Sequence, residues 1–100
     1  MRTAKQYMEE ITPAAQCPCC GYVTLPERGE YDICPVCFWE DDGIDDPDFD
    51  PSLSPNHMTL RQGRENFLKY GAYKNEEITI KVCVLPESER KHFEKRPLPE

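Results

Sequence analysis

Two pairs of cysteines constrain this chain more than any other feature of its sequence. Each pair fits the pattern Cys-Pro-x-Cys, first as Cys17-Pro18-Cys19-Cys20 and then, after a 13-residue spacer, as Cys34-Pro35-Val36-Cys37. A turn across each pair lets two thiolates converge on one ion, and four thiolates match the tetrahedral coordination of zinc. The sequence therefore predicts a metal site with four ligands: Cys17, Cys20, Cys34 and Cys37.

Iron is the alternative metal, because four thiolates also hold iron in rubredoxin-like electron carriers. Zinc is favoured, and a closed site of four cysteines indicates a structural rather than a catalytic role. A disulfide framework is the other alternative; Met1 to Ile11 does not read as a secretory signal, so we expect reduced cysteines and a cytoplasmic protein. Cys19 is expected to point away from the cluster, with a spare ligand or a reactive thiol as alternatives, and Cys83 to be a buried thiol.

The first part of the chain predicts a metal-stapled hairpin. Residues 22–25 and 31–33 are rich in strand-forming side chains and flank a turn at 26–29, so we expect them to pair and join the two cysteine pairs. Residues 1–11 carry apolar side chains at helical spacing and predict a short helix. A chain of 100 residues buries a modest core, which makes a metal staple valuable.

The second part predicts one capped helix and one strand. Thr59 and Gln62 form a capping-box pattern before an apolar stripe, and Gly71 supplies a stop, so a helix is expected over 60–70. Apolar alternation predicts a strand over 77–85, and the proline-rich stretch 40–55 predicts an extended loop. The expected fold is α+β, a zinc-ribbon or rubredoxin-like hairpin with one packed helix and a further strand. It forms a single domain over 1–100, with an N-terminal segment at 1–15, a core at 16–73, and a C-terminal strand and tail at 74–100, of which 97–100 are expected to be mobile.

The charge of the chain is unevenly distributed. Nine acidic residues and no lysine or arginine lie between Gly29 and Leu60, whereas the whole chain carries a net charge of −7. Such a stretch repels nucleic acid and favours a basic protein partner, with simple solubility as the alternative. No segment approaches the length of a membrane span. We expect the partner surface to comprise Trp39, Asp45, Asp46, Asp48 and Asp50.

Two further residues have alternative or structural roles. Trp39 follows the second cysteine pair directly, so it is either an interface anchor or a cover for the metal site that packs against the 60–70 helix. Arg64 lies on the apolar face of that helix, where an unpaired guanidinium is costly. We therefore expect Arg64 to reach an acidic group near Asp41 or Asp42 and tie the loop to the helix.

Three blocks of this sequence, in order, resemble the CPCC family of cysteine-rich bacterial proteins. The first block is Cys-Pro-Cys-Cys-Gly-Tyr, which starts at Cys17. The second is Gly-x-Tyr-Asp-Ile-Cys-Pro-Val-Cys-Phe-Trp-Glu-Asp-Asp, which starts at Gly29, and the third is Asn-x-x-Thr-Leu-x-x-Gly-Arg-x-Asn-Phe, which starts at Asn56. The resemblance covers roughly Gln16 to Tyr73 and implies a zinc-ribbon-like domain of largely undefined biochemistry, with some relatives suggested as immunity proteins in bacterial toxin systems.

The chain departs from this family at two positions. Relatives often have glycine where this chain has Phe38, which puts the ideal turn after the second cysteine pair in question. They also often have alanine where this chain has Gly63, and a mid-helix glycine costs about 1 kcal/mol relative to alanine unless something packs against it.

The sequence thus favours a zinc-binding protein-interaction domain without enzymatic activity. The acidic face would meet a basic partner, as an immunity protein would meet a cationic toxin. The alternatives are an iron electron carrier of rubredoxin type and a transcription-associated zinc ribbon. Glu40 and Asp42 are paired carboxylates, but no nucleophile is recognisable near them in the sequence. The sequence therefore gives no reason to expect an enzyme.

Overall fold

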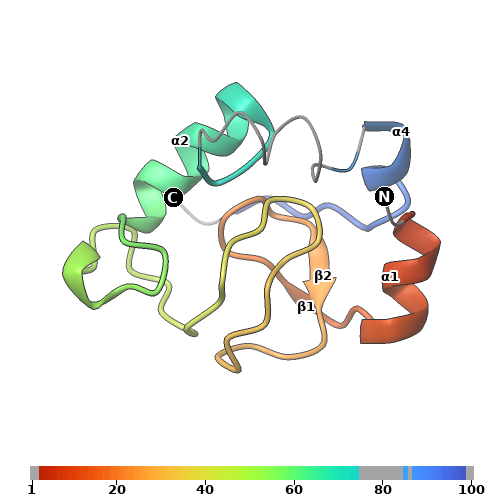
Figure 1. The fold of residues 1–100 in the computed structure, drawn as a ribbon, viewed down its shortest axis with the longest axis horizontal. Coiled ribbons are helices and arrows are strands. Elements are labelled where there is room, and N and C mark those ends of the chain that lie inside the picture. The colour runs from red at the N-terminus through yellow and green to blue at the C-terminus, as the bar shows by residue number, and fades with distance from the viewer. Residues whose placement is uncertain (1–2, 75–84, 86, 99–100) are drawn as a thin grey trace.

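The structure is a computed structural model that describes residues 3–74, 85 and 87–98 (Figure 1). Within them lie the helices α1 (Ala4–Ile11), α2 (Leu60–Tyr70) and α4 (Glu87–Arg90), the strands β1 (Ala15–Gln16) and β2 (Val23–Leu25), and the 3-10 turn η1 (Pro51–Leu53). The α+β class and the zinc-ribbon-like architecture are confirmed. The strand predicted over 77–85, including Cys83, lies outside the described residues except at Leu85.

Each cysteine pair lies at the tip of its own small hairpin. β1 and β2 pair antiparallel around the first cysteine pair, with Ala15 opposite Leu25. Around the second pair, Ile33 and Glu40 form a single antiparallel bridge. The prediction of a strand near 22–25 is confirmed, but the prediction that it pairs with 31–33 is wrong. The chain already reverses within each Cys-Pro-x-Cys turn, so each turn brings its own flanking residues together.

Both α1 and α2 begin with a capping box, which was predicted for α2 but not for α1. In α2 the Thr59 side chain accepts from the backbone N–H of Gln62, and the Gln62 side chain accepts from the backbone N–H of Thr59. Thr3 and Gln6 make the same reciprocal pair at the start of α1. Gly71 ends α2 in the left-handed conformation, with φ of 81°. These local hydrogen bonds satisfy backbone groups that a helix end leaves open, so they fix where the helices begin and end.

Helix α2 packs on the cysteine-bearing hairpins through Leu60, Gly63 and Phe67, which are all buried. The Phe67 ring meets the Tyr22 ring edge-on at 6.4 Å between centroids. The apolar stripe predicted over 60–70 consists of Leu60, Phe67 and Leu68 and was expected to be buried, but Leu68 is 82% exposed. At 3.6 residues per turn, Leu68 lies about 140° around the helix from Gly63, so a helix docked through Gly63 turns Leu68 to solvent.

The C-terminal segment lies along the first hairpin, and of the predicted mobile tail at 97–100 the structure describes only Pro97 and Leu98. The backbone N–H of Val23 donates to the Glu94 carbonyl oxygen at 2.7 Å, and that of Arg96 donates to the Gly21 carbonyl oxygen at 2.9 Å. The Gln16 side-chain amide donates to the carbonyl oxygens of Arg96 and Pro97. About 70 residues after β2, the chain returns and lies along the edge of β2 that β1 does not occupy (Figure 1).

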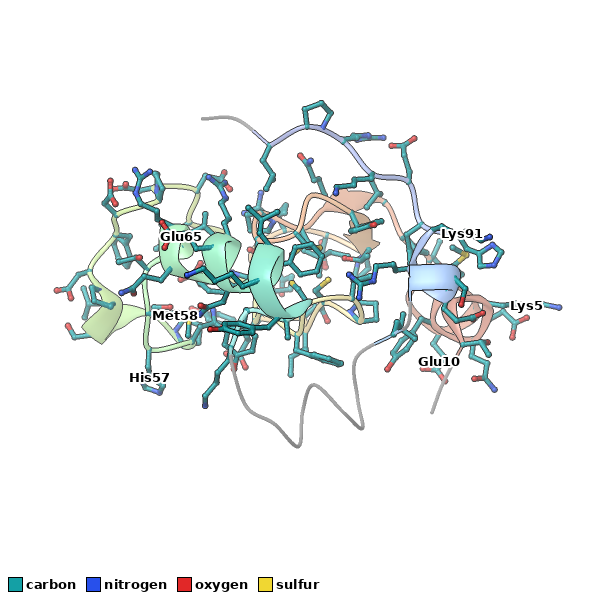
Figure 2. All side chains as sticks on the ribbon, turned by 90° about the horizontal axis from the view of Figure 1, so that it is seen from above. Lys5, Glu10, His57, Met58, Glu65 and Lys91 are labelled. Carbon is teal, nitrogen blue, oxygen red and sulfur yellow. The ribbon has the colours of Figure 1, made fainter. Side chains whose placement is uncertain are left out.

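The core is centred on the two cysteine pairs. The buried side chains around the sulfur atoms include Leu25, Val36, Trp39, Leu60 and Phe93. Exposed charged side chains such as Lys5 and Lys91 lie on the outside of the molecule (Figure 2). Among the described residues, no helix has the length and apolar character needed to cross a membrane.

Candidate metal centre

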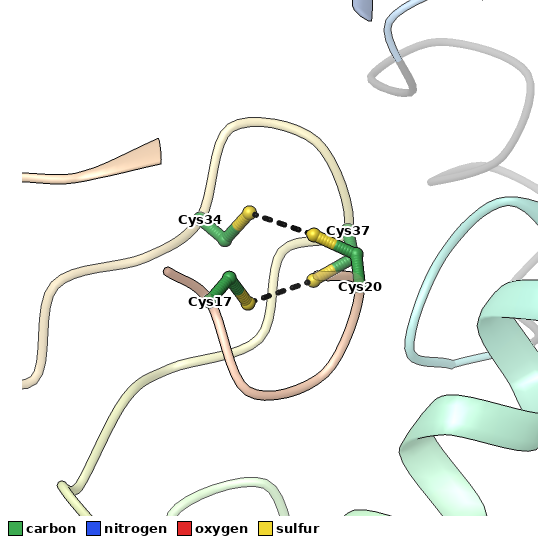
Figure 3. A group of neighbouring side chains, drawn as sticks. All are labelled: Cys17, Cys20, Cys34 and Cys37. Atoms are coloured by element: carbon green, nitrogen blue, oxygen red, sulfur yellow. Dashed lines mark hydrogen bonds between the residues drawn. The ribbon is translucent and has the colours of Figure 1, made fainter. Parts of the chain in front are cut away.

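Four sulfur atoms converge in the centre of the core (Figure 3). The ligand atoms of Cys17, Cys20, Cys34 and Cys37 all lie within 4.8 Å of one another. Two contacts join the two hairpins, at 3.6 Å between the Sγ atoms of Cys17 and Cys37 and 3.7 Å between those of Cys20 and Cys34. These distances exceed the roughly 2.05 Å of a disulfide bond. They match the edge of about 3.8 Å that a sulfur tetrahedron has when each zinc–sulfur bond is about 2.3 Å.

The two Cys-Pro-x-Cys turns have the same backbone geometry. In the first, the N–H of Cys17 donates to the Tyr22 carbonyl oxygen at 2.8 Å, and the N–H of Gly21 donates to the Cys17 carbonyl oxygen at 3.0 Å. In the second, the equivalent bonds run from Cys34 to the Trp39 carbonyl oxygen at 3.0 Å and from Phe38 to the Cys34 carbonyl oxygen at 2.8 Å. The two turns therefore hold their cysteine pairs with the same backbone conformation, and the sulfur atoms of one turn face those of the other.

Phe38 adopts the left-handed conformation that glycine adopts at the equivalent place in the first turn. The φ angles are 69° at Phe38 and 85° at Gly21. A residue with a side chain pays about 1–2 kcal/mol for this conformation. The departure from the family pattern at Phe38 therefore leaves the turn geometry intact and adds local strain.

Burial makes the four thiols difficult to ionise together. It raises the pKa of Cys20 and Cys37 well above the ordinary value of a thiol. Burial also opposes ionisation of Cys34, but hydrogen bonds from the other three thiols and from Thr24 outweigh it and bring the pKa of Cys34 well below its usual range. Four buried thiolates need a compensating positive charge, so the donor set fits a divalent ion that accepts soft ligands.

Two hydrogen-bond donors at Cys34 were not predicted from the sequence. The Thr24 hydroxyl lies 3.0 Å from the Cys34 Sγ, and the backbone N–H of Val36 donates to the same sulfur at 3.4 Å. The Val36 donor follows from the turn itself, because its amide lies two residues after the cysteine. Thr24 reaches Cys34 across the two hairpins, and the only signal for it in the sequence is a hydroxyl in an otherwise apolar strand.

An arginine and a buried aspartate link the two loops that flank the second cysteine hairpin. Arg28 donates two hydrogen bonds to the Asp41 carboxylate, at 2.8 and 3.2 Å, and the backbone N–H groups of Gly29 and Gly43 each donate one at 3.0 Å. Burial raises the pKa of Asp41, but these donors outweigh it and hold the pKa below its ordinary value. Asp41 therefore joins the loop before the second cysteine pair to the loop after it.

The predicted contact of Arg64 with the 40–42 segment is wrong. Arg28 binds Asp41 in its place, while Arg64 Nε donates to the Pro18 carbonyl oxygen at 2.8 Å. Arg64 thus connects α2 to the first cysteine turn. It remains a structural residue that ties the helix to the hairpins, but at a different point from the one expected.

Trp39 lies under α2 and is 2% exposed, so it cannot act as the surface anchor of the predicted partner site. The alternative role, packing between the metal centre and the helix, describes its position. A Cβ atom at Gly63 would lie 2.7 Å from Trp39 Cζ3, and 3.3 Å from the Sγ of Cys19. Glycine in the middle of α2 is therefore required by the indole, and Cys19 packs beside it outside the four-sulfur group.

The four aspartates predicted as the partner surface are exposed, but two of them form ion pairs within the chain. Asp45 binds Arg28 at 2.7 Å, and Asp48 binds Arg61 through both carboxylate oxygens at 2.9 Å. Asp46 and Asp50 instead accept backbone N–H groups two residues further along, at 3.0 and 2.9 Å. The arginines come from outside the acidic stretch, so sequence counting within it overestimated the free negative charge.

His57, the histidine within the acidic stretch, lies outside the sulfur cluster. His57 is exposed and points away from the core, as Figure 2 shows. In the part of the chain that the structure describes, the grouped metal-ligating side chains are the four cysteines.

Comparison with known proteins identifies one relationship. The family model described as Cysteine-rich CPCC matches residues 15–89, which includes both cysteine pairs and α2. Neither the curated proteins nor the solved structures give a match.

Proposed function

The chain belongs to the cysteine-rich CPCC family, and we propose that it is a zinc-stapled protein-interaction domain without enzymatic activity. The observation that carries the zinc site is the distance between sulfur atoms on opposite hairpins, 3.6 and 3.7 Å. Cys17, Cys20, Cys34 and Cys37 would hold the ion. Four protein ligands leave no open position for a substrate, so the ion supplies stability and shape to the domain.

Burial of the cluster supports a structural ion rather than the iron of an electron carrier. The four cysteines are between 0% and 3% exposed, and Trp39 and α2 cover the side on which Cys19 and Gly63 meet. Electron transfer favours a redox centre close to the surface, whereas a structural ion is retained better when solvent is kept away. We propose a cytoplasmic location, because a site of four thiolates persists in a reducing compartment.

Metal analysis of protein purified without added metal tests this proposal. We expect about one zinc ion per chain and a colourless protein, because zinc has a filled d shell and iron–thiolate centres absorb visible light. Serine at Cys17 or Cys34 should abolish retention of the ion, while Cys19→Ser, a matched buried thiol outside the cluster, should retain it. Stoichiometric iron with visible colour would support the electron carrier, and retention of zinc by Cys34→Ser would refute the ligand set.

We propose further that a basic protein binds the acidic side of the domain. In the part of the chain that the structure describes, Arg28 pairs with both Asp41 and Asp45, and Arg61 pairs with Asp48, which leaves one net negative charge in this group. The acidic stretch still has carboxylates that form no ion pair with arginine or lysine among the described residues: Glu30, Asp32, Glu40, Asp42, Asp46 and Asp50. A cationic toxin neutralised by an immunity protein is one partner of this chemistry. A nucleic acid is disfavoured because its phosphates would meet these carboxylates.

The partner proposal is tested by removing the same amount of negative charge from two different places on the domain. Asp46→Asn with Asp50→Asn keeps the oxygen that accepts each backbone N–H and removes two negative charges. Glu9→Gln with Glu65→Gln removes the same charge from exposed positions on α1 and α2. Photo-crosslinking from position 46 would capture the partner, and stopped-flow association would then be measured at low and high salt. Only the aspartate pair should slow association and flatten its salt dependence; equal effects of both pairs would return the acidic stretch to a role in solubility.

A further inference from the structure

Thr24 is a polar residue in a strand that is otherwise apolar and buried. It lies between Val23 and Leu25 in β2, where all three residues are buried and Thr24 itself is 0% exposed. Burying a hydroxyl without a hydrogen bond costs on the order of 1–3 kcal/mol in proteins, so such a group is retained where it has a partner. The partner of the Thr24 hydroxyl is a sulfur atom, the Sγ of Cys34, at 3.0 Å.

Metal binding fixes the direction of this hydrogen bond. A cysteine that ligates a metal is a thiolate, which carries no hydrogen, so the Thr24 hydroxyl must donate to it. The backbone N–H of Val36 donates to the same sulfur at 3.4 Å. Among the described residues, no hydroxyl donates to the sulfur atoms of Cys17, Cys20 or Cys37, so the cluster is asymmetric in its hydrogen bonds.

The position of Thr24 in the fold adds a second effect. β2 follows the first cysteine pair, whereas Cys34 opens the second pair. The hydroxyl therefore spans the two hairpins and holds the Cys34 side chain toward Cys20, whose Sγ lies 3.7 Å away. A ligand oriented before the ion arrives loses less side-chain freedom when it binds.

We propose that Thr24 is the residue that positions Cys34 and disperses its negative charge, so that the cluster retains its ion. This inference rests on the proposed metal site and assigns one residue outside the ligand set to it. The charge that Thr24 withdraws from Cys34 makes that sulfur a weaker nucleophile than the other three. Electrophiles that remove the ion should therefore attack Cys17, Cys20 or Cys37 before Cys34.

Two substitutions separate the hydroxyl from the shape of the side chain. Thr24→Val keeps the branched shape and the strand preference but removes the donor, while Thr24→Ser keeps the donor. We expect Thr24→Val to weaken zinc affinity by roughly 10- to 100-fold, measured by competition with a chromophoric chelator, and Thr24→Ser to stay close to the unmodified chain. In the cobalt-loaded proteins, the sulfur-to-metal charge-transfer band should move to lower energy in Thr24→Val only.

The outcomes distinguish this inference from the proposed function. Failure of the unmodified chain to bind zinc or cobalt would overturn both. Stoichiometric binding by the unmodified chain, with unchanged affinity and charge-transfer energy in Thr24→Val, would overturn the role of Thr24 alone. So would equal losses in Thr24→Val and Thr24→Ser, since these would reflect packing.

A measurement on the unmodified chain decides the matter if Thr24→Val does not fold. In the cadmium-loaded protein, a hydroxyl proton that bonds to a ligating sulfur shows scalar coupling to the metal nucleus. We expect this coupling for the Thr24 hydroxyl proton. A Thr24 hydroxyl that exchanges rapidly with water and shows no coupling would overturn the proposal. Partial alkylation followed by peptide mapping gives a second check, with Cys34 expected to be modified last.

Discussion

Gly63 sits where α2 crosses Trp39, and replacing it with alanine sets two opposing effects against each other. In an exposed helix the substitution would stabilise the protein by about 0.8–1.0 kcal/mol. Here the added Cβ would lie 2.7 Å from Cζ3 and 3.0 Å from Cε3 of the indole. The ring is rigid, buried and held edge-on to Tyr73 at 5.8 Å between centroids, so it cannot move away without disturbing its neighbours.

The cost of the clash should exceed the gain in helix propensity. Inserting a methyl group into a well-packed core costs typically about 1–3 kcal/mol, which leaves a net destabilisation of about 1 kcal/mol. For a domain of this size, that corresponds to a fall of roughly 4–8 °C in the melting temperature. Thermal unfolding of the zinc-loaded protein measures this fall. The chain has one tryptophan, so a change in its fluorescence would report the displaced ring directly.

Two controls test why Gly63→Ala should lower rather than raise the melting temperature. Leu68→Ala changes an exposed position of the same helix between two good helix formers and should leave the melting temperature nearly unchanged. In a Trp39→Phe background the smaller ring removes the contact, so Gly63→Ala should become neutral or stabilising there. A Gly63→Ala protein that melts higher than the unmodified chain, with unchanged tryptophan fluorescence, would refute the packing argument.

Three further outcomes are expected. Phe38→Gly should raise the free energy of unfolding by up to about 1 kcal/mol in chemical denaturation, because it relieves the left-handed strain at a half-buried side chain; a loss of stability would mean that the phenyl ring contributes more than the strain costs. Asp41→Asn should cost about 1.5–3 kcal/mol near neutral pH. The pKa of Asp41 is lower in the folded state, so its charge stabilises the fold fully above the ordinary aspartate pKa, and this stabilisation is lost as the pH falls through the folded-state pKa. The difference in free energy of unfolding between Asp41→Asn and the unmodified chain should therefore shrink below about pH 4. A difference that stays constant with pH would contradict the charge-based account. Removing the ion with a strong chelator should disorder both cysteine hairpins, seen as loss of amide dispersion in NMR spectra, whereas native-like spectra without metal would show that the core suffices.

Features whose cause lies within a few residues could be predicted from the sequence. The helix α2 begins and ends at the predicted residues because Thr59, Gln62 and Gly71 act on their own backbone neighbourhood. The four cysteines cluster as predicted because each Cys-Pro-x-Cys segment reverses the chain direction locally. A small domain has a single core, so the two turns pack against each other within it.

Features that depend on distant residues could not be predicted in the same way. Arg28 and Arg64 were both available to Asp41, and the choice between them depends on how the loop at 26–29 folds back. The exposure of Leu68 depends on the rotation of α2, which the contact of Gly63 with Trp39 determines. A helical stripe in a sequence marks a range of possible faces, and a single close contact selects one of them.

The hydrogen-bonded return of residues 94–96 to Gly21 and Val23 affects where this domain can be cut. A fragment that ends with the family match at residue 89 would keep all four clustered cysteines and all of α2, yet it would expose one edge of β2. Open strand edges recruit other chains, so such a fragment should self-associate even when it is loaded with metal. The smallest autonomous unit of this protein is therefore larger than the region by which its family is recognised.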